Sequence, residues 1–247
     1  MLKHFPNKTK IIFLDLEYFV PIQDRERMST SGMKFSPTLP GHKIIGGVFM
    51  TYYPMLDTCE PPVSIWDWNT KSEKILLTKI FNLLEQEWRG IENKEHLGSL
   101  MLSGIGISHS DLPALSAKLN EHSVSSPKRI YDVLYGCRQI DLSVATFCQF
   151  GFNNAYFAYP KPKSALYQKY LNGKTMLSGT SVWDLYESKR YSEIEARTLD
   201  EVNDCFLIYK SMFDLKKKND SSLKRLIKLD KARESESEII DLENKAA

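Results

Sequence analysis

The sequence predicts an α/β fold in which helices flank a mixed sheet. Strand-like apolar segments and amphipathic helical segments follow one another in the order strand, strand, strand, helix, strand, helix. Three strands in direct succession predict an antiparallel start to the sheet, and the strand after the first helix predicts a parallel addition. A chain of 247 residues is long enough to bury a full core.

Composition and charge exclude several classes of protein. Apolar residues make up 42% of the chain and charged residues 26%, which is typical of a globular protein in water. The net charge of +2 does not by itself indicate a polyanionic partner. The 4 cysteines form no C-x-x-C pair, so we expect reduced thiols and no structural zinc. No segment reaches the roughly 18 to 20 apolar residues of a membrane span, and we expect a cytoplasmic protein without a membrane partner.

The first strand, predicted over residues 10–19, ends in two acids. Asp15 and Glu17 are two positions apart, so their side chains share a strand face with Phe13. The run is apolar at both alternations, which predicts a strand covered on both sides, where two unpaired carboxylates would be costly. A divalent cation would offset their charge. Alternatively, the strand ends at Leu14 and both acids lie in solvent.

The remaining elements follow from apolar spacing and from caps and breakers. A long polar segment, residues 21–42, separates the first two strands, and such a segment beside a strand end that carries chemistry is often a substrate lid. We predict further strands over 43–53, 63–68 and 99–108, and helices from Thr70 or Ser72 to Gly90 and over 111–119, 140–150, 182–189 and 193–213.

The chain changes character near its end. From residue 216 a basic stretch is followed by an acidic one, a pattern of solvated helices or disordered tails. We therefore predict one domain over residues 8–213 and a charged extension, helical or disordered, over 214–247.

Two further acids stand at informative positions. Asp111 opens a predicted helix directly after a strand, and Asp204 lies on the last predicted helix. Alone, Asp111 would be an ordinary helix cap and Asp204 a surface acid. Their interest lies in their combination with Asp15 and Glu17.

In this combination the chain resembles the DEDD family of 3′–5′ exonucleases, which have the ribonuclease-H-like fold. Residues 13–17 (FLDLE) are similar to the first exonuclease motif and residues 104–115 (GIGISHSDLPAL) to the second. Residues 176–209 (MLSGTSVWDLYESKRYSEIEARTLDEVNDCFLIY) resemble the third region of the branch related to the polymerase B proofreading domain. Residues 138–142 (RQIDL) match a helix start of that branch.

This resemblance implies a hydrolase that removes nucleotides from the 3′ end of a nucleic acid, which we expect to be single-stranded. It implies two Mg²⁺ or Mn²⁺ ions, the first held by Asp15, Glu17 and Asp204 and the second by Asp15 and Asp111. Family members orient the attacking water with a Tyr four residues, or a His five residues, before the final Asp. Here Asp200 and a leucine stand at those positions, so Asp200 either orients the water or is a solvent-facing acid.

The departure at Asp200 leaves a second hypothesis open. The chain is then a catalytically weak or inactive relative that acts as a nucleic-acid-binding or protein-interaction module. The acidic end of the extension resembles the glutamate-rich C-terminal signals of proteins exported by bacterial type IV systems, which makes secretion into a host cell an alternative to the cytoplasm.

Substrate contacts are predicted from the motifs and from a segment rich in rings and lysines. Residues 156–174 interleave tyrosines with lysines, a combination suited to stacking bases and contacting phosphates of a single strand. The alternative is a tyrosine-rich segment packed on the core. The residues that we assign to substrate binding are Leu16, Ser108, His109, Lys161 and Lys163.

Overall fold

The computed structural model describes residues 9–27, 33–92, 99–146, 150 and 160–246. The chain divides into two compact units, Met1–Ile208 and Tyr209–Ala247. The sheet and the candidate site belong to the first unit. The predicted domain limit at residue 213 stays a prediction. In the described part of the chain, no helix has both the length and the apolar character that crossing a membrane requires.

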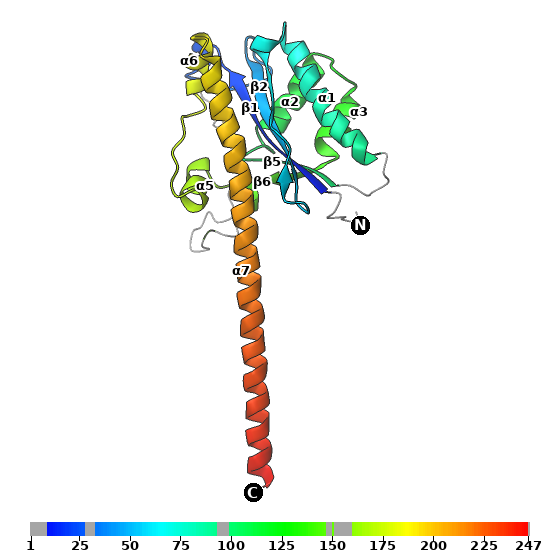
Figure 1. Cartoon of the computed structure of the whole chain (residues 1–247). Helices are drawn as coiled ribbons and strands as arrows, with labels where there is room; N and C mark the ends of the chain where they lie inside the picture. Colours follow the sequence, from blue (N-terminus) through cyan, green and yellow to red (C-terminus); the bar gives the residue numbers. More distant parts are fainter. Residues whose placement is uncertain (1–8, 28–32, 93–98, 147–149, 151–159, 247) are drawn as a thin grey trace. The chain divides into compact units, whose positions relative to one another are not determined.

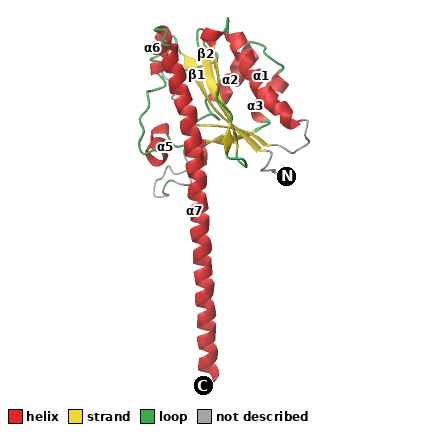
Figure 2. Cartoon of the chain, in the orientation of Figure 1, coloured by secondary structure: helices red, strands yellow, loops and turns green. Residues whose placement is uncertain are grey.

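A mixed sheet forms the centre of the first unit (Figure 2). Strand β1 (Thr9–Phe19) pairs antiparallel with β2 (Lys43–Tyr53) and parallel with β5 (Ser99–Gly104). Strand β6 (Arg138–Asp141) adds parallel to β5. The short strands β3 (Thr58–Cys59) and β4 (Val63–Trp66) both pair antiparallel with β2. The predicted α/β class with a mixed sheet is confirmed.

Besides this sheet, the described residues form seven α-helices and two 3₁₀ turns. Helices α1, α2 and α3 lie together on one side of it (Figure 1). The 3₁₀ turns cover Ile22–Asp24 and Asp67–Asn69. The α-helices are α1 (Glu73–Glu92), α2 (Asp111–Glu121), α3 (Pro127–Tyr135), α4 (Leu142–Ala145), α5 (Lys163–Tyr170), α6 (Ser181–Glu187) and α7 (Tyr191–Ala246).

The two faces of β1 have different partners. Ile12, Leu14 and Leu16 belong to the buried cluster formed with α1, α2 and α3. Phe13, on the opposite face, has its ring centroid 5.7 Å from that of Phe206 on α7. Both faces are therefore covered, as the unbroken apolar run predicted. Asp15 has the parity of Phe13, so β1 presents its acids to the α7 side.

The structure differs from the predicted elements mainly around Asp141. The predicted helix over 140–150 is wrong at its start, because β6 extends to Asp141 and only then does α4 begin, with the Asp141 carboxylate accepting a hydrogen bond from the Ser143 N–H at 3.0 Å. The strand predicted to residue 108 ends at Gly104, and the strand predicted to residue 68 ends at Trp66. Helix α3 was not predicted. It begins with the Ser126 hydroxyl accepting from the Arg129 N–H.

Two glycines let β2 pass close to its neighbours beside the acids. Gly46 pairs with Glu17, and the register of β1 against β2 shifts directly after Glu17. A Cβ on Gly46 would lie 2.1 Å from a ring atom of Trp66, and the φ of Gly46 is 150°. A Cβ on Gly47 would lie 2.6 Å from the carbonyl oxygen of Asp15. Only glycine permits this approach and this backbone conformation.

Candidate metal centre

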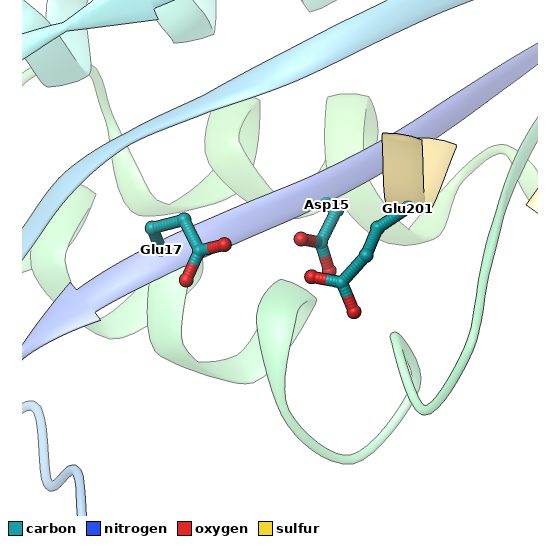
Figure 3. A group of neighbouring side chains, drawn as sticks. All are labelled: Asp15, Glu17 and Glu201. Atoms are coloured by element: carbon teal, nitrogen blue, oxygen red, sulfur yellow. The ribbon is translucent and has the colours of Figure 1, made fainter. Parts of the chain in front are cut away.

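Three carboxylates converge where β1 meets helix α7. One oxygen from each of Asp15, Glu17 and Glu201 lies within 4.8 Å of the other two (Figure 3). Strand β1 supplies the first two side chains, and Glu201 reaches them from α7. Oδ2 of Asp15 is buried and has no hydrogen-bond partner in the structure. An unpaired buried carboxylate oxygen is costly, and it is a free ligand position for a cation.

Asp111 adjoins this cluster from the first turn of α2. Its Oδ1 accepts a hydrogen bond from the Leu16 N–H at 3.1 Å, and its Oδ2 accepts one from the Ser110 hydroxyl at 2.5 Å. Burial, followed by the negative charge of Asp15, raises the pKa of Asp111 to about 7. Asp111 is thus buried near the charge of Asp15, and its role as a ligand of the second ion stays a prediction.

Asp204 does not join the three acids, although the resemblance gave it the role of final metal ligand. Its carboxylate accepts two hydrogen bonds from Nζ of Lys174, at 3.0 and 2.9 Å. Glu201, one helical turn earlier on α7, meets Asp15 and Glu17 instead. Asp200, predicted to orient a water, has a side chain that is 63% exposed and lies 3.6 Å from the same lysine. Sequence reasoning therefore missed the acid of α7 that reaches the cluster.

Spacing gave a partial signal for Glu201, because it indicates an inward position that Asp204 shares. Glu201 lies seven residues after Ile194 and seven before Ile208, both fully buried. It is therefore an acid in the middle of the inward stripe of α7, a position that needs a partner.

Two cations of the chain lie among the acids. Nη1 of Arg197 donates to Oε1 of Glu17 and lies 2.6 Å from Oε2 of Glu201. Nζ of Lys163, at the start of α5, contacts Glu201 as well. The Thr198 hydroxyl donates to Oε1 of Glu17 at 2.8 Å. The carboxylates are thus partly neutralised from within.

Burial nevertheless dominates the electrostatics of the first two acids. Loss of water around Glu17, followed by the negative charge of Asp15, raises the pKa of Glu17 to about 8, against the opposing effects of Arg197, Thr198 and Lys163. Burial also raises the pKa of Asp15, and the positive charges of Lys163 and Arg197 oppose it. The internal cations do not fully offset the cost of concentrating these charges.

The turn that leads into α2 is fixed by Asp141. Its carboxylate accepts hydrogen bonds from the Gly106 N–H at 2.9 Å, from the Ser108 N–H at 3.0 Å and from the Ser108 hydroxyl at 2.5 Å. Ser108, predicted to bind substrate, is therefore engaged with Asp141. His109 is 62% exposed, with Nδ1 3.8 Å from Oδ2 of Asp141. Asp141 thereby sets where Asp111 begins its helix.

Two adjoining cavities meet at Lys163 and Arg197. A cavity of about 370 Å³ is lined by the acid cluster, by Asp111 and by Leu16, together with Lys34 and Phe35 from the segment predicted to act as a lid. A second cavity of about 510 Å³ lies on the α5 side. Its polar lining includes Lys163, Lys174, Arg197, Ser164, Thr175 and Ser178.

Of the remaining predicted substrate contacts, Lys163 lines both cavities. Lys161 instead has its Nζ 5.5 Å from the ring centroid of Phe150, and its N–H donates to the Ser143 carbonyl at 2.8 Å. Residues 156–159 of the ring-and-lysine segment lie outside the described residues.

No model of a known protein family matches the chain, and no curated protein matches its sequence.

Proposed function

We propose that this chain is a metal-dependent 3′–5′ exonuclease with a ribonuclease-H-like fold, acting on single-stranded nucleic acid. The observation that carries the proposal is the convergence of Asp15, Glu17 and Glu201, from β1 and α7, beside the buried Asp111. The family resemblance implied the same meeting of a strand, the start of a helix and a final helix. In the proposal Glu201 takes the place first given to Asp204.

The residues fit a pair of divalent ions. All four side chains offer hard carboxylate oxygens, which suit Mg²⁺ or Mn²⁺. Oδ2 of Asp15 is buried without a partner and is a ready ligand. When bound, the ions would activate water and stabilise the negative charge that develops on the phosphate. Asp15 would be shared between them, because its charge acts on both Asp111 and Glu17.

The reaction is hydrolysis of the terminal phosphodiester. The oxygen of water bonds to phosphorus, the bond from phosphorus to the 3′ oxygen of the preceding nucleotide breaks, and that oxygen takes up a proton. A nucleoside 5′-monophosphate leaves the 370 Å³ cavity, whose walls include the aromatic side chains of Phe35 and Trp183. Both rings are largely buried, and the ring of Phe35 is stacked on that of Tyr18, so they bound the space for the terminal base.

The test is degradation of a 5′-labelled single strand in Mn²⁺ and in EDTA. We expect a ladder of products shortened from the 3′ end in Mn²⁺, none in EDTA, and none with Asp15→Asn in either buffer. Lys128→Met is the matched control, since Lys128 is an exposed lysine paired with Asp132 on α3, outside both cavities. Intact substrate with the wild-type protein in Mn²⁺ would contradict the proposal.

A second function is favoured by Arg197 and Lys163, which partly neutralise Glu17 and Glu201. If these cations are permanent substitutes for metal, the chain is an inactive nucleic-acid-binding or protein-interaction module. Tight binding of the single strand, equal in Mn²⁺ and EDTA and without products, would identify that module.

A further inference from the structure

Arg197 engages two of the three carboxylates that would hold a metal ion in the acid cluster. Its Nη1 donates to Glu17 and lies 2.6 Å from Oε2 of Glu201, so one guanidinium nitrogen bridges two of the three converging carboxylates. The residue is only 9% exposed. A second cation cannot share these oxygens without strong repulsion, because like charges about 4 Å apart repel by roughly 4 kcal/mol at an effective dielectric of 20.

The other side of the guanidinium is held weakly. Nε and Nη2 donate to the Leu177 carbonyl oxygen at 3.4 and 3.3 Å. Both distances exceed the roughly 2.7 to 3.2 Å of a good N–H to oxygen hydrogen bond. The carboxylates of Glu17 and Glu201 are therefore the main partners of Arg197. Loss of those partners to another cation would leave the side chain free to turn.

The space that it would turn into adjoins the acids. Arg197 lines the cavity of about 510 Å³ as well as the acid cavity, and Lys163 and Lys174 share the wall of the larger one. Hydroxyl groups of Ser164, Thr175 and Ser178 line it too. Cations and hydroxyl donors together bind phosphate oxygens, and a guanidinium does so with two parallel hydrogen bonds.

We propose that Arg197 has two positions: it is the counter-ion of Glu17 and Glu201 until a divalent cation takes these carboxylates, and it then binds a backbone phosphate of the substrate strand in the adjoining cavity. The proposal rests on the proposed metal-dependent function. It makes Arg197 both the competitor of the metal and a substrate contact, so metal and strand would be bound in a coupled manner.

The first test measures metal alone, without nucleic acid. Titration calorimetry with Mn²⁺ on the full chain should give an affinity for Arg197→Met that exceeds the wild-type affinity by roughly tenfold or more, within the usual range of coupling between sites. Arg197→Lys, measured in parallel, keeps a charge that supports folding, but its side chain is one atom shorter than that of arginine, so its ammonium reaches Glu17 and Glu201 less well. We expect it to bind Mn²⁺ more tightly than wild type and less tightly than Arg197→Met.

The matched control is Arg190→Met. Arg190, the residue before α7, is paired with Glu193 in the first turn of that helix, and it lines neither cavity. Its removal should therefore leave the Mn²⁺ affinity unchanged. If Arg197→Met does not fold, Arg197→Lys decides alone. Equal or weaker Mn²⁺ affinity in the variant that folds overturns the proposal, as does the absence of Mn²⁺ binding in every variant.

The second test measures the strand. A fluorescently labelled oligothymidylate of ten nucleotides, with phosphorothioate linkages at its 3′ end, resists cleavage. Its binding can be followed by fluorescence anisotropy. Arg197→Met should bind it several-fold more weakly than wild type in Mn²⁺ and equally in EDTA, because Arg197 is engaged with the acids when metal is absent. Equal affinities in Mn²⁺, or the same loss in both buffers, would overturn the phosphate-binding half of the proposal.

The outcomes separate this inference from the proposed function. A wild-type protein that degrades 3′ ends in Mn²⁺ while Arg197→Met shows no gain in Mn²⁺ affinity refutes the inference and leaves the exonuclease intact. If instead the wild-type protein is inactive but Arg197→Met gains Mn²⁺ affinity, the competition between Arg197 and metal is supported and the exonuclease activity is refuted.

Discussion

The main-chain N–H of Leu16 donates a hydrogen bond to the Asp111 carboxylate at 3.1 Å, and this bond ties the start of helix α2 to the strand between two acids of the cluster. Asp111 thus has a structural role as well as a proposed role in metal binding. The two roles can be separated, because an amide oxygen accepts the same hydrogen bond without carrying a charge.

Asp111→Asn and Asp111→Ala should differ in stability. In EDTA, Asp111→Ala leaves the N–H of Leu16 buried and unpaired, which costs about 1 to 3 kcal/mol. Asp111→Asn keeps the acceptor and removes a charge next to Asp15, so its free energy of unfolding should equal or exceed that of the wild type. Urea denaturation followed by circular dichroism measures both. Equal destabilisation of the two variants would show that the Leu16 bond matters little.

Glu201 and Asp204 should respond differently to substitution. Mn²⁺ at about 100 times its Kd should stabilise the wild type by about 2.7 kcal/mol. Glu201→Gln should lose most of this stabilisation, since it removes a charged ligand. Asp204→Asn should keep it and instead lower the stability in EDTA by about 1 to 3 kcal/mol, because a buried oxygen pair loses its charge-assisted bonds to Lys174. Thermal melts with and without Mn²⁺ distinguish them, and the reverse pattern would restore Asp204 as the ligand.

The metal-free protein should lose stability as the pH rises toward 8. The pKa of Glu17 is raised from 4.5 to about 8 in the folded chain. Below pH 4.5 the Glu17 carboxyl is protonated in both the folded and the unfolded chain, so its burial does not change the free energy of unfolding with pH. Between the two values the unfolded chain releases a proton that the folded chain retains, so the free energy of unfolding falls with pH and levels off above the higher value.

Glu17→Gln should flatten this part of the pH profile. The measurement is the melting temperature in EDTA across the interval from about pH 5 to pH 8.5. Mn²⁺ should have the opposite pH dependence, stabilising more at high pH, because metal binds the ionised carboxylate. A Glu17→Gln profile parallel to that of the wild type would contradict the raised pKa.

Asp141 should have the opposite effect to Glu17, because its contribution to the free energy of unfolding falls as the pH is lowered. Although burial opposes it, hydrogen bonds from Ser108, Ser143 and Gly106 lower the pKa of Asp141 below its usual value. The stability that Asp141 contributes is fully present at a pH above its pKa in the unfolded chain. It is lost as the pH falls through its lower pKa in the folded chain. Asp141→Asn should be less stable than wild type at neutral pH, and the difference should shrink in acid. A difference that stays constant with pH would exclude this role.

The positions of β1 and β2 could be predicted because apolar alternation and breakers define them locally. The paired acids Asp15 and Glu17 followed from the same pattern, since strand parity fixes their common face. The choice between Glu201 and Asp204 could not be made from spacing alone. Both acids are buried on α7, and which one meets β1 depends on how the helix is rotated against the sheet. That rotation is a product of tertiary packing around residues such as Phe206.

Asp141 shows a second limit of local patterns. Its place in an Ile-Asp-Leu sequence indicated a helix start, and the structure confirms a short helix there. Its larger effect comes from groups 33 and 35 positions earlier, in the turn at Ser108 and Gly106. Such long-range hydrogen bonds leave no periodic signature. For the same reason, the shortened strand before that turn could not be predicted.

Gly46 also determines which relatives of this chain can share its architecture. Its positive φ strains any other residue whatever space is available, and the indole of Trp66 fills the space where a side chain would stand. Across any lineage that retains the acids of β1, position 46 should therefore be invariant. A search pattern that joins this glycine to Asp15 and Glu17 would be more selective for true relatives than the acids by themselves.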